Sequence, residues 1–241
     1  MSKKTIETHD VEILGRFALF TRPETQSSPV SSRIPTAEAL RGMMKCILHR
    51  DSIFPVPIRV VLLPYVDDIF KDPVTGQPYV SKDIETYCMS QYMLENKTRG
   101  KWFGSPANHV YLHRNHYKVT FKVEATVPQH AELRRRLTYG IWDSHPYLGQ
   151  RECGAIIRLW PEGKEETPLQ VSFLEPLVRL GVGGKAVNFL VRNGCFVFDY
   201  AQTRAALAKT RWGRQDIRDD LAREQDEEDD RDDDGEDETC R

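Results

Sequence analysis

The chain has 241 residues, enough for one large domain or a compact pair whose core needs no disulfide or metal ion to stabilise it. Its five cysteines are widely spaced without a Cys-x-x-Cys pair, and no apolar stretch is long enough to cross a bilayer. These features argue against a disulfide framework, a zinc knuckle and a membrane protein. The first residues, MSKKTIETHD, have no apolar run behind their lysines. We therefore expect no signal peptide and a soluble protein of the cytoplasm.

The formal net charge of −2 conceals two parts of opposite sign. Residues 216–241 hold fifteen acidic and four basic residues, which leaves +9 for residues 1–215 and −11 for the end of the chain. The positive part predicts binding to a polyanion. The run DEEDDRDDDGEDE has no apolar side chain to bury, so we expect a disordered acidic tail. This tail either adds only solubility or competes with nonspecific nucleic acid for the positive part.

The first predicted elements are a strand, a helix and a second strand. Apolar and polar residues alternate over 11–19, which is typical of a strand, and Pro23 ends its pairing because proline has no N–H. A helix is predicted over 36–49, where apolar side chains recur on one face. Gly42 within it predicts close packing on a sheet. The β-branched residues of 58–65 predict the next strand, so the chain begins as a βαβ-type unit.

Residues 66–106 lose this periodicity, and we expect a long inserted loop or hairpin there. The segment places cations beside aromatic residues, among them Lys101 and Trp102. That mixture binds single-stranded nucleic acid through phosphate pairing and base stacking. An ordinary solvated loop with Trp102 in the core explains these residues equally well.

The stretch from His109 to Val127 predicts a further strand, with clear alternation over 119–125, and contains three histidines. Side chains alternate along a strand, so His109 and His113 share one face while His116 points to the other. The three therefore do not converge on one ion, and we expect no metal site there.

The next predicted helix covers 129–139 and carries three adjacent arginines. Because they spread over most of the helix circumference, at most two can meet one ligand. We expect Arg134 and Arg135 to contact phosphates, with an ordinary solvated helix face as the alternative.

The rest of the chain predicts a strand at 154–160 and further strands within 171–200. The segment GVGGK lacks the spacing and the Ser or Thr of a nucleotide P-loop, so it predicts a hairpin turn. There is no Gly-x-Ser-x-Gly elbow and no paired-carboxylate signature. Hydrolase and kinase functions therefore find no support in the sequence.

Four segments occur in a characteristic order: LFTRPE after the first strand, IPTAEALRGMMKCI as the first helix, YLHRNHYKV in a later strand and LGQREC after the arginine-rich helix. Together they resemble the family-five CRISPR-associated (Cas) proteins, most of all those of type I-C systems. The resemblance runs from Gly15 to Cys153, is weak after about Pro161, and leaves out the acidic tail.

The resemblance implies an α+β fold. We expect a ferredoxin-like (RRM-like) domain of the RAMP superfamily with an antiparallel sheet over 1–160, interrupted by the insertion at about 66–106. A small C-terminal β extension over 161–215 and the acidic tail over 216–241 are expected to follow.

The resemblance also implies a function that needs no cofactor and no contact with a membrane. Family members hold the 5′ handle of the CRISPR RNA in the type I interference complex, Cascade, beside its large subunit and its backbone subunits. The end of the first strand and the start of the first helix would then form an RNA-facing rim. Arg16, Arg22 and Arg33 are expected to contact phosphates there. An ion pair between Arg22 and Glu24 is the alternative.

Type I-C members resemble metal-independent endoribonucleases that use a tyrosine and a Lys-His pair. In this chain the tyrosine position falls on Leu48, and the Lys-His position falls on Pro128-Gln129, or one residue later with a gap. His49, Arg50 and His130 are candidate catalytic substitutes by their chemistry. Because Leu48 can act as neither acid nor base, we favour a binding subunit over a nuclease that processes precursor CRISPR RNA. An RRM-like RNA-binding protein outside CRISPR defence is a third interpretation.

Overall fold

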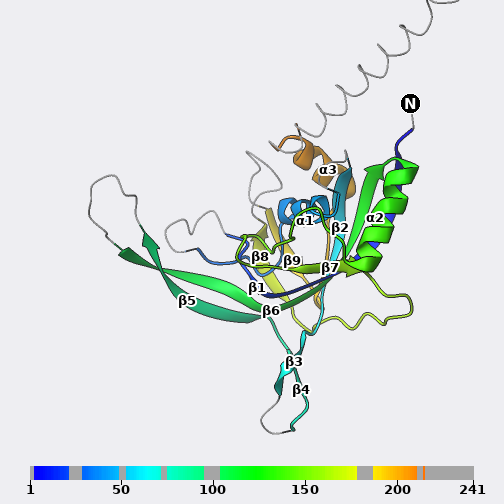
Figure 1. Cartoon of the computed structure of the whole chain (residues 1–241). Helices are drawn as coiled ribbons and strands as arrows, with labels where there is room; N and C mark the ends of the chain where they lie inside the picture. The colour runs from blue at the N-terminus through cyan, green and yellow to red at the C-terminus, as the bar shows by residue number, and fades with distance from the viewer. Residues whose placement is uncertain are drawn as a thin grey trace, which may run out of the picture.

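The structure is a computed structural model that describes residues 3–21, 29–48, 53–71, 75–94, 104–177, 187–210 and 214 (Figure 1). In chain order the elements are β1 (Thr5–Ala18), α1 (Ala37–Lys45), β2 (Phe54–Leu62), β3 (Val66–Lys71), β4 (Pro78–Val80), β5 (Glu85–Leu94), β6 (Gly104–Ala125), α2 (Val127–Tyr139), β7 (Ile156–Leu159), β8 (Phe173–Leu177), β9 (Val187–Val191), β10 (Cys195–Val197) and α3 (Tyr200–Ala208).

The central sheet has the strand order β10-β2-β6-β1-β7, and β5 pairs with the outer part of β6. Every pair of strands within it is antiparallel. Along the chain its core elements run β1-α1-β2-β6-α2-β7. This is the connectivity of a ferredoxin-like domain, so the predicted α+β fold with an antiparallel sheet is confirmed.

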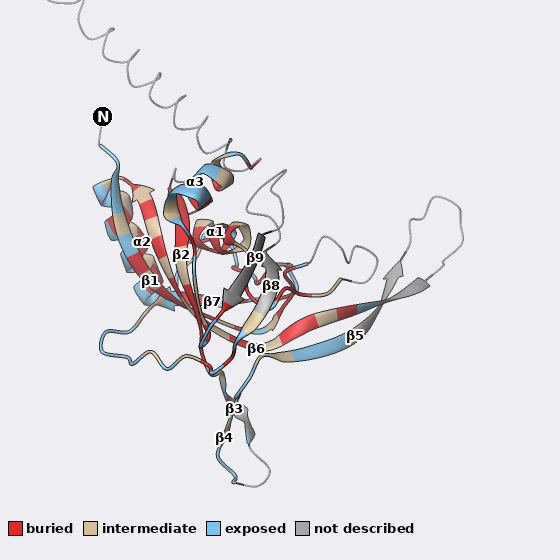
Figure 2. Cartoon of the chain, turned by 180° about the vertical axis from the view of Figure 1, so that it is seen from behind, coloured by how far each residue is buried: buried red, intermediate tan, exposed pale blue. Residues whose placement is uncertain are grey.

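The core lies between one face of this sheet and the helices (Figure 1). Alternation along β1 and β6 turns every second side chain toward the helices, and most of these positions in the middle of the strands are apolar and buried (Figure 2). The sequestered side chains include Val11, Ile13, Leu40, Met43, Met44, Val119, Phe121, Val123, Leu133 and Leu137. Each contributes about 1.5–3 kcal/mol by leaving water.

Two strands begin earlier than the sequence predicted. β1 starts at Thr5 because its ladder with β6 continues to the pair Thr5–Ala125. β2 starts at Phe54 although Pro55 and Pro57 lie within it. Proline is tolerated there because β10 pairs only with the second half of β2, and the register shifts after Pro57.

The range 66–106 contains a hairpin, β3–β4, that projects from the sheet, and the strand β5 (Figure 1). β5 and the outer half of β6 form a second, longer projection, which we call the arm. At the base of the arm Arg114 has a positive φ of 56°, which is rare for a residue with a Cβ. Its guanidinium contacts Asp67 of β3 at 3.2 Å and Glu85 of β5 at 3.0 Å.

The range 161–215 contains the hairpin β8–β9, the strand β10 and also α3, a helix that the sequence analysis did not predict. α3 begins at a cap, since Asp199 accepts a hydrogen bond from the backbone N–H of Gln202 at 2.7 Å. The GVGGK segment and the acidic tail lie outside the described residues. In the described part of the chain, no helix has the length and hydropathy needed to cross a membrane.

Gly42 does not have the role that the sequence suggested. It is exposed on the outer face of α1, and a Cβ built there meets no atom within 4 Å. The prediction that it allows close packing on the sheet is therefore wrong, because the buried face of α1 is made by Leu40, Met43 and Met44 instead.

Candidate nucleic-acid interface

Three segments that are distant in sequence meet beside the end of β1, and we call them the rim: residues 16–21, 29–36 and 146–155. The backbone N–H of Leu19 donates to the carbonyl of Leu148 at 3.0 Å, and that of Ser32 donates to the carbonyl of Phe20 at 2.9 Å. Gly149 has a φ of +86°, and a Cβ there would lie 2.1 Å from the carbonyl oxygen of Leu19. Only glycine fits this close approach, so the LGQREC segment is built to lie against β1.

Arg16 and Arg33, which the sequence predicted to contact RNA, are both exposed on the rim. The guanidinium carbon of Arg16 lies 5.8 Å from the centre of the Phe17 ring, and that of Arg33 lies 5.3 Å from the Phe173 ring. Arg151, on the loop of the rim, is exposed as well. The rim thus presents cations to solvent from all three of its segments.

An aromatic cluster lies where β1, β5 and β6 meet, next to Arg16. The ring of Phe17 stacks on His113 with centroids 5.1 Å apart, and Tyr87 lies 5.7 Å from Phe17. Tyr87 is 48% exposed. Burial, followed by the charge of Arg114, lowers the pKa of His113, so this ring favours its neutral form. Exposed neutral rings beside a cation are the chemistry that stacks nucleobases. The sequence analysis missed this cluster because Tyr87 lies in the segment without periodicity.

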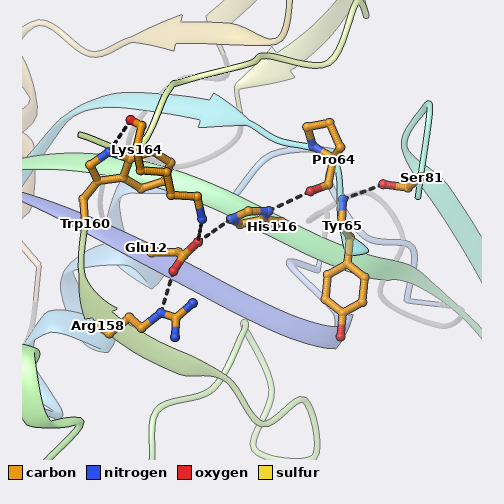
Figure 3. Close-up of polar contacts among 8 residues, drawn as sticks. All are labelled: Glu12, Pro64, Tyr65, Ser81, His116, Arg158, Trp160 and Lys164. Atoms are coloured by element: carbon orange, nitrogen blue, oxygen red, sulfur yellow. Dashed lines mark hydrogen bonds and ion pairs between the residues drawn. The ribbon is translucent and has the colours of Figure 1, made fainter. Parts of the chain in front are cut away.

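Charged side chains gather around Glu12 on the face of the sheet opposite α1 and α2, which we call the open face (Figure 3). Glu12 is only 1% exposed and accepts hydrogen bonds from His116 at 2.8 Å, from Arg158 at 2.5 Å and from Lys164. Burial alone would raise the pKa of Glu12, but these hydrogen bonds outweigh it and hold the pKa far below its usual range. Glu12 therefore stays ionised and compensates the cations around it.

The other cations of the open face also have acidic partners. Arg59 forms a bidentate pair with Glu166, and Lys118 lies 3.3 Å from Asp10 and 3.2 Å from Glu166. Glu166 belongs to the segment after β7, which therefore contributes a carboxylate to this face. These ion pairs neutralise much of the positive charge from which the sequence analysis predicted binding to a polyanion. The rim, where exposed Arg16 and Arg33 lie near the aromatic cluster, is our candidate for a phosphate surface.

The arginines of α2 are paired along their own helix or with β1. Arg134 lies 3.2 Å from Glu7, and Arg135 lies 2.7 Å from Glu132. Hydrogen bonds from Arg135 and Arg136 lower the pKa of Glu132 to about 2. Exposed pairs of this kind contribute little to stability, so Arg134 and Arg135 can exchange a carboxylate for a phosphate.

Arg136, the third arginine of α2, has a different environment from the other two. It donates to the carbonyl of Ile47 at 2.8 Å and also pairs with Asp143. These contacts fasten α2 to the end of α1, which is a structural role.

His130, a candidate catalytic residue, is 2% exposed on α2. Its Nδ1 lies 3.2 Å from Nε2 of His9, which is also 2% exposed, and its Nε2 lies 3.2 Å from the carbonyl oxygen of Thr5. The two rings are stacked with centroids 5.4 Å apart. Burial, followed by the charges of His130 and Arg134, lowers the pKa of His9 to about 4. His9 escaped the sequence analysis because 121 residues separate it from its partner.

Several predicted site residues lie outside the described residues, and for them the sequence hypotheses stay predictions. They are Arg22, His49, Arg50, Lys101 and Trp102. Leu48, which occupies the position of the family's tyrosine, is described and is 1% exposed within the core. That position therefore holds a packing side chain.

The connectivity, the antiparallel sheet and the helices on one of its faces define a ferredoxin-like α+β protein. A model of the family described as "CRISPR-associated protein (Cas_Cas5)" matches residues 10–233. The chain belongs to this family of CRISPR-associated proteins. The match continues past Cys153 and into the acidic tail, which the resemblance drawn from the sequence had left out.

Solved structures resemble the chain at low sequence identity. One, described as "Crystal Structure of CRISPR-associated Protein", has a TM-score of 0.56 and 16% identity over 81% of this chain and 94% of the other. A functionally uncharacterized protein from Streptococcus mutans, SMU1763c, has a TM-score of 0.49 and 18% identity over the same shares. The first likeness supports the fold alone. A search of curated proteins finds no match.

Proposed function

We propose that the protein binds CRISPR RNA as a subunit of a type I interference complex, Cascade, and holds the 5′ handle of that RNA at the rim. Its partners in the complex would be the large subunit and the backbone subunits. Membership of the family supports a role in CRISPR defence. The observation that carries the choice of surface is the placement of exposed Arg16 and Arg33 beside the Phe17–Tyr87–His113 cluster. Phosphates and unstacked bases require this combination of cations and rings.

Binding without cleavage is favoured over a working nuclease. A general base must reach the 2′-hydroxyl proton, within hydrogen-bond distance. His130 is buried, with both ring nitrogens within hydrogen-bond distance of other groups, and Leu48 offers no titratable group. The metal-independent endoribonuclease is the second candidate function, and it depends on His49 and Arg50.

The first test measures binding of the full chain to its cognate repeat RNA in EDTA, by fluorescence anisotropy over a range of salt concentrations. Arg16→Gln and Arg33→Gln should each weaken binding about fivefold and each lower the salt slope by about one. Arg204→Gln is the matched control, because Arg204 pairs with Glu124 on the open face. It should leave both quantities unchanged. Binding that is insensitive to salt, or equal losses in all three variants, would contradict the rim as the phosphate surface.

The same mixtures, run on a denaturing gel, separate the two candidate functions. A subunit that only binds leaves the RNA intact, whereas a nuclease yields product bands without divalent metal. If product forms, His49→Ala and His130→Ala identify the base by the loss of product with binding retained.

A further inference from the structure

Glu7, His9 and His130 form a cluster of metal-ligand side chains where β1 meets α2. Glu7 and His9 are two residues apart on a strand, so they lie on the same face. α2, which carries His130, packs on that face (Figure 2). One ligand atom from each residue lies within 4.8 Å of the other two. The earlier expectation of no metal site concerned only His109, His113 and His116 on β6.

The two imidazole nitrogens already have the spacing of ligands to one ion. Nε2 of His9 and Nδ1 of His130 are 3.2 Å apart. A tetrahedral zinc ion with bonds of about 2.0–2.1 Å to nitrogen holds its ligand atoms about 3.3–3.4 Å apart. The spacing is therefore within a few tenths of an ångström of that of two ligands, and both rings must turn so that their lone pairs converge on the ion. The flexible side chain of Glu7 reaches the third position by rotation.

The surroundings of His130 fix the tautomer that metal binding requires. Its Nε2 faces the carbonyl oxygen of Thr5 at 3.2 Å, and a carbonyl can only accept. Nε2 therefore carries the hydrogen, and the lone pair of Nδ1 points toward His9. Histidines that bind metals commonly donate their other N–H to a backbone carbonyl in this way.

We propose that Glu7, His9 and His130 bind one divalent transition-metal ion of the zinc class, with water as the fourth ligand. Binding replaces the hydrogen bond between the histidines, and the hydrogen of His9 moves from Nε2 to Nδ1, so neither imidazole loses a proton to solvent. The Arg134–Glu7 pair opens, and the Arg134 side chain, already 59% exposed, turns into water. The ion would link β1 to α2, in a role independent of RNA binding.

The test uses the full chain, stripped with EDTA, dialysed and then titrated with Zn²⁺ and with Co²⁺ in excess Mg²⁺. Magnesium occupies the carboxylates of the acidic tail, while imidazole ligands select the transition metals. One equivalent should bind, with the visible absorption of tetrahedral cobalt and a higher Tm. Glu7→Gln should weaken binding about tenfold or more. His9→Gln and His130→Gln should abolish the cobalt absorption, and His145→Gln, at an exposed histidine, should retain it.

A further variant makes the test independent of folding. Glu7 and Arg134 have partly exposed side chains, so their substitution leaves the core intact. Arg134→Gln should strengthen binding several-fold, because it removes a cation next to the metal. The absence of cobalt absorption in the wild-type protein would overturn the proposal. So would equal metal affinities of Glu7→Gln and Arg134→Gln.

Discussion

Glu12 illustrates how one buried side chain organises the open face of the sheet. It lies at the centre of β1 and compensates His116, Arg158 and Lys164 at once. An acidic residue at a buried position is costly unless it is paired in this way. The sequence showed an alternating strand here, but it could not show that the partners come from β6, β7 and the segment after β7.

Glu12→Gln should lower the free energy of unfolding by about 2–3 kcal/mol at pH 7, as measured by urea denaturation. The substitution keeps the size of the side chain and removes the charge that pairs with Arg158 and Lys164 and accepts a hydrogen bond from His116. The loss is smaller than for a fully buried pair because Arg158 is half exposed and can turn to water. Glu124→Gln, whose partner Arg204 is similarly exposed, serves as the comparison and should lose about 1 kcal/mol. Equal losses in the two variants would contradict a special role for Glu12.

Gly149 and Gly42 provide a matched pair of glycine positions. Gly149→Ala should lower the free energy of unfolding by about 2 kcal/mol or more, because its φ is positive and a Cβ would collide with the Leu19 carbonyl. Gly42→Ala should raise it by about 0.5–1 kcal/mol, because alanine favours the helix and the added Cβ meets nothing. Thermal and urea denaturation measure both. A stabilising Gly149→Ala would show that the LGQREC loop does not need its close approach to β1.

At the scale of elements, β1 and α2 are joined by a buried pair of histidines, and protonation of His9 opposes folding. The pKa of His9 is about 4 in the folded protein and 6.5 without the fold. The unfolded chain therefore binds more protons between these values, and stability falls as the pH is lowered from 6.5 toward 4. Glu12 affects stability at lower pH than His9 does. Because its pKa is depressed in the folded protein, its contribution to the free energy of unfolding is lost only below about pH 4.5.

We expect this pH dependence to amount to as much as about 3 kcal/mol between pH 6.5 and 4, measured by urea denaturation in EDTA. His9→Gln should flatten most of the slope in that window. A smaller slope should remain from His113, whose pKa is also lowered. If His9→Gln keeps the full wild-type slope, the buried pair is not its source.

The elements themselves were largely predictable, whereas their contacts were not. Alternation in β1 and β6 and helical periodicity in α1 and α2 are local signals, and each of these elements is present. Three features of the structure depend on contacts between residues more than a hundred positions apart. They are the pairing of His9 with His130, the approach of Gly149 to Leu19 and the ion pair of Glu166 with Arg59 on the open face. α3 was missed because most of its apolar residues are alanines, which mark a buried face only weakly, and only Thr203 and Leu207 are buried.

At the scale of the whole molecule, the division of charge along the chain acquires a more specific meaning. The +9 of residues 1–215 is not spread evenly over the surface, because the open face is internally paired. Among the described residues, exposed arginines lie at the rim and on α2. The acidic residues of 216–241 are therefore expected to compete for the same places.

Truncation after Gln215 should raise the affinity for nonspecific RNA by on the order of tenfold at low salt, measured by anisotropy with an unrelated oligonucleotide. The difference should vanish at high salt, where charges separated by more than a few ångströms are screened. A full-length chain in which the acidic residues of the tail are changed to their amides is the matched control and should behave like the truncation. Unchanged affinity in both proteins would limit the tail to a role in solubility.

Arg114 has a consequence for how the arm is aimed. A single residue with a left-handed backbone separates the stretch of β6 that belongs to the core from the stretch that belongs to the arm, and its guanidinium is clamped between Asp67 and Glu85. The direction of a long projection is thereby decided at one joint, which lies between the buried core side chains Leu112 and Tyr117 of the same strand. Substitutions at this joint and at its two carboxylates can therefore change the direction of the arm, while the domain beneath it keeps its shape.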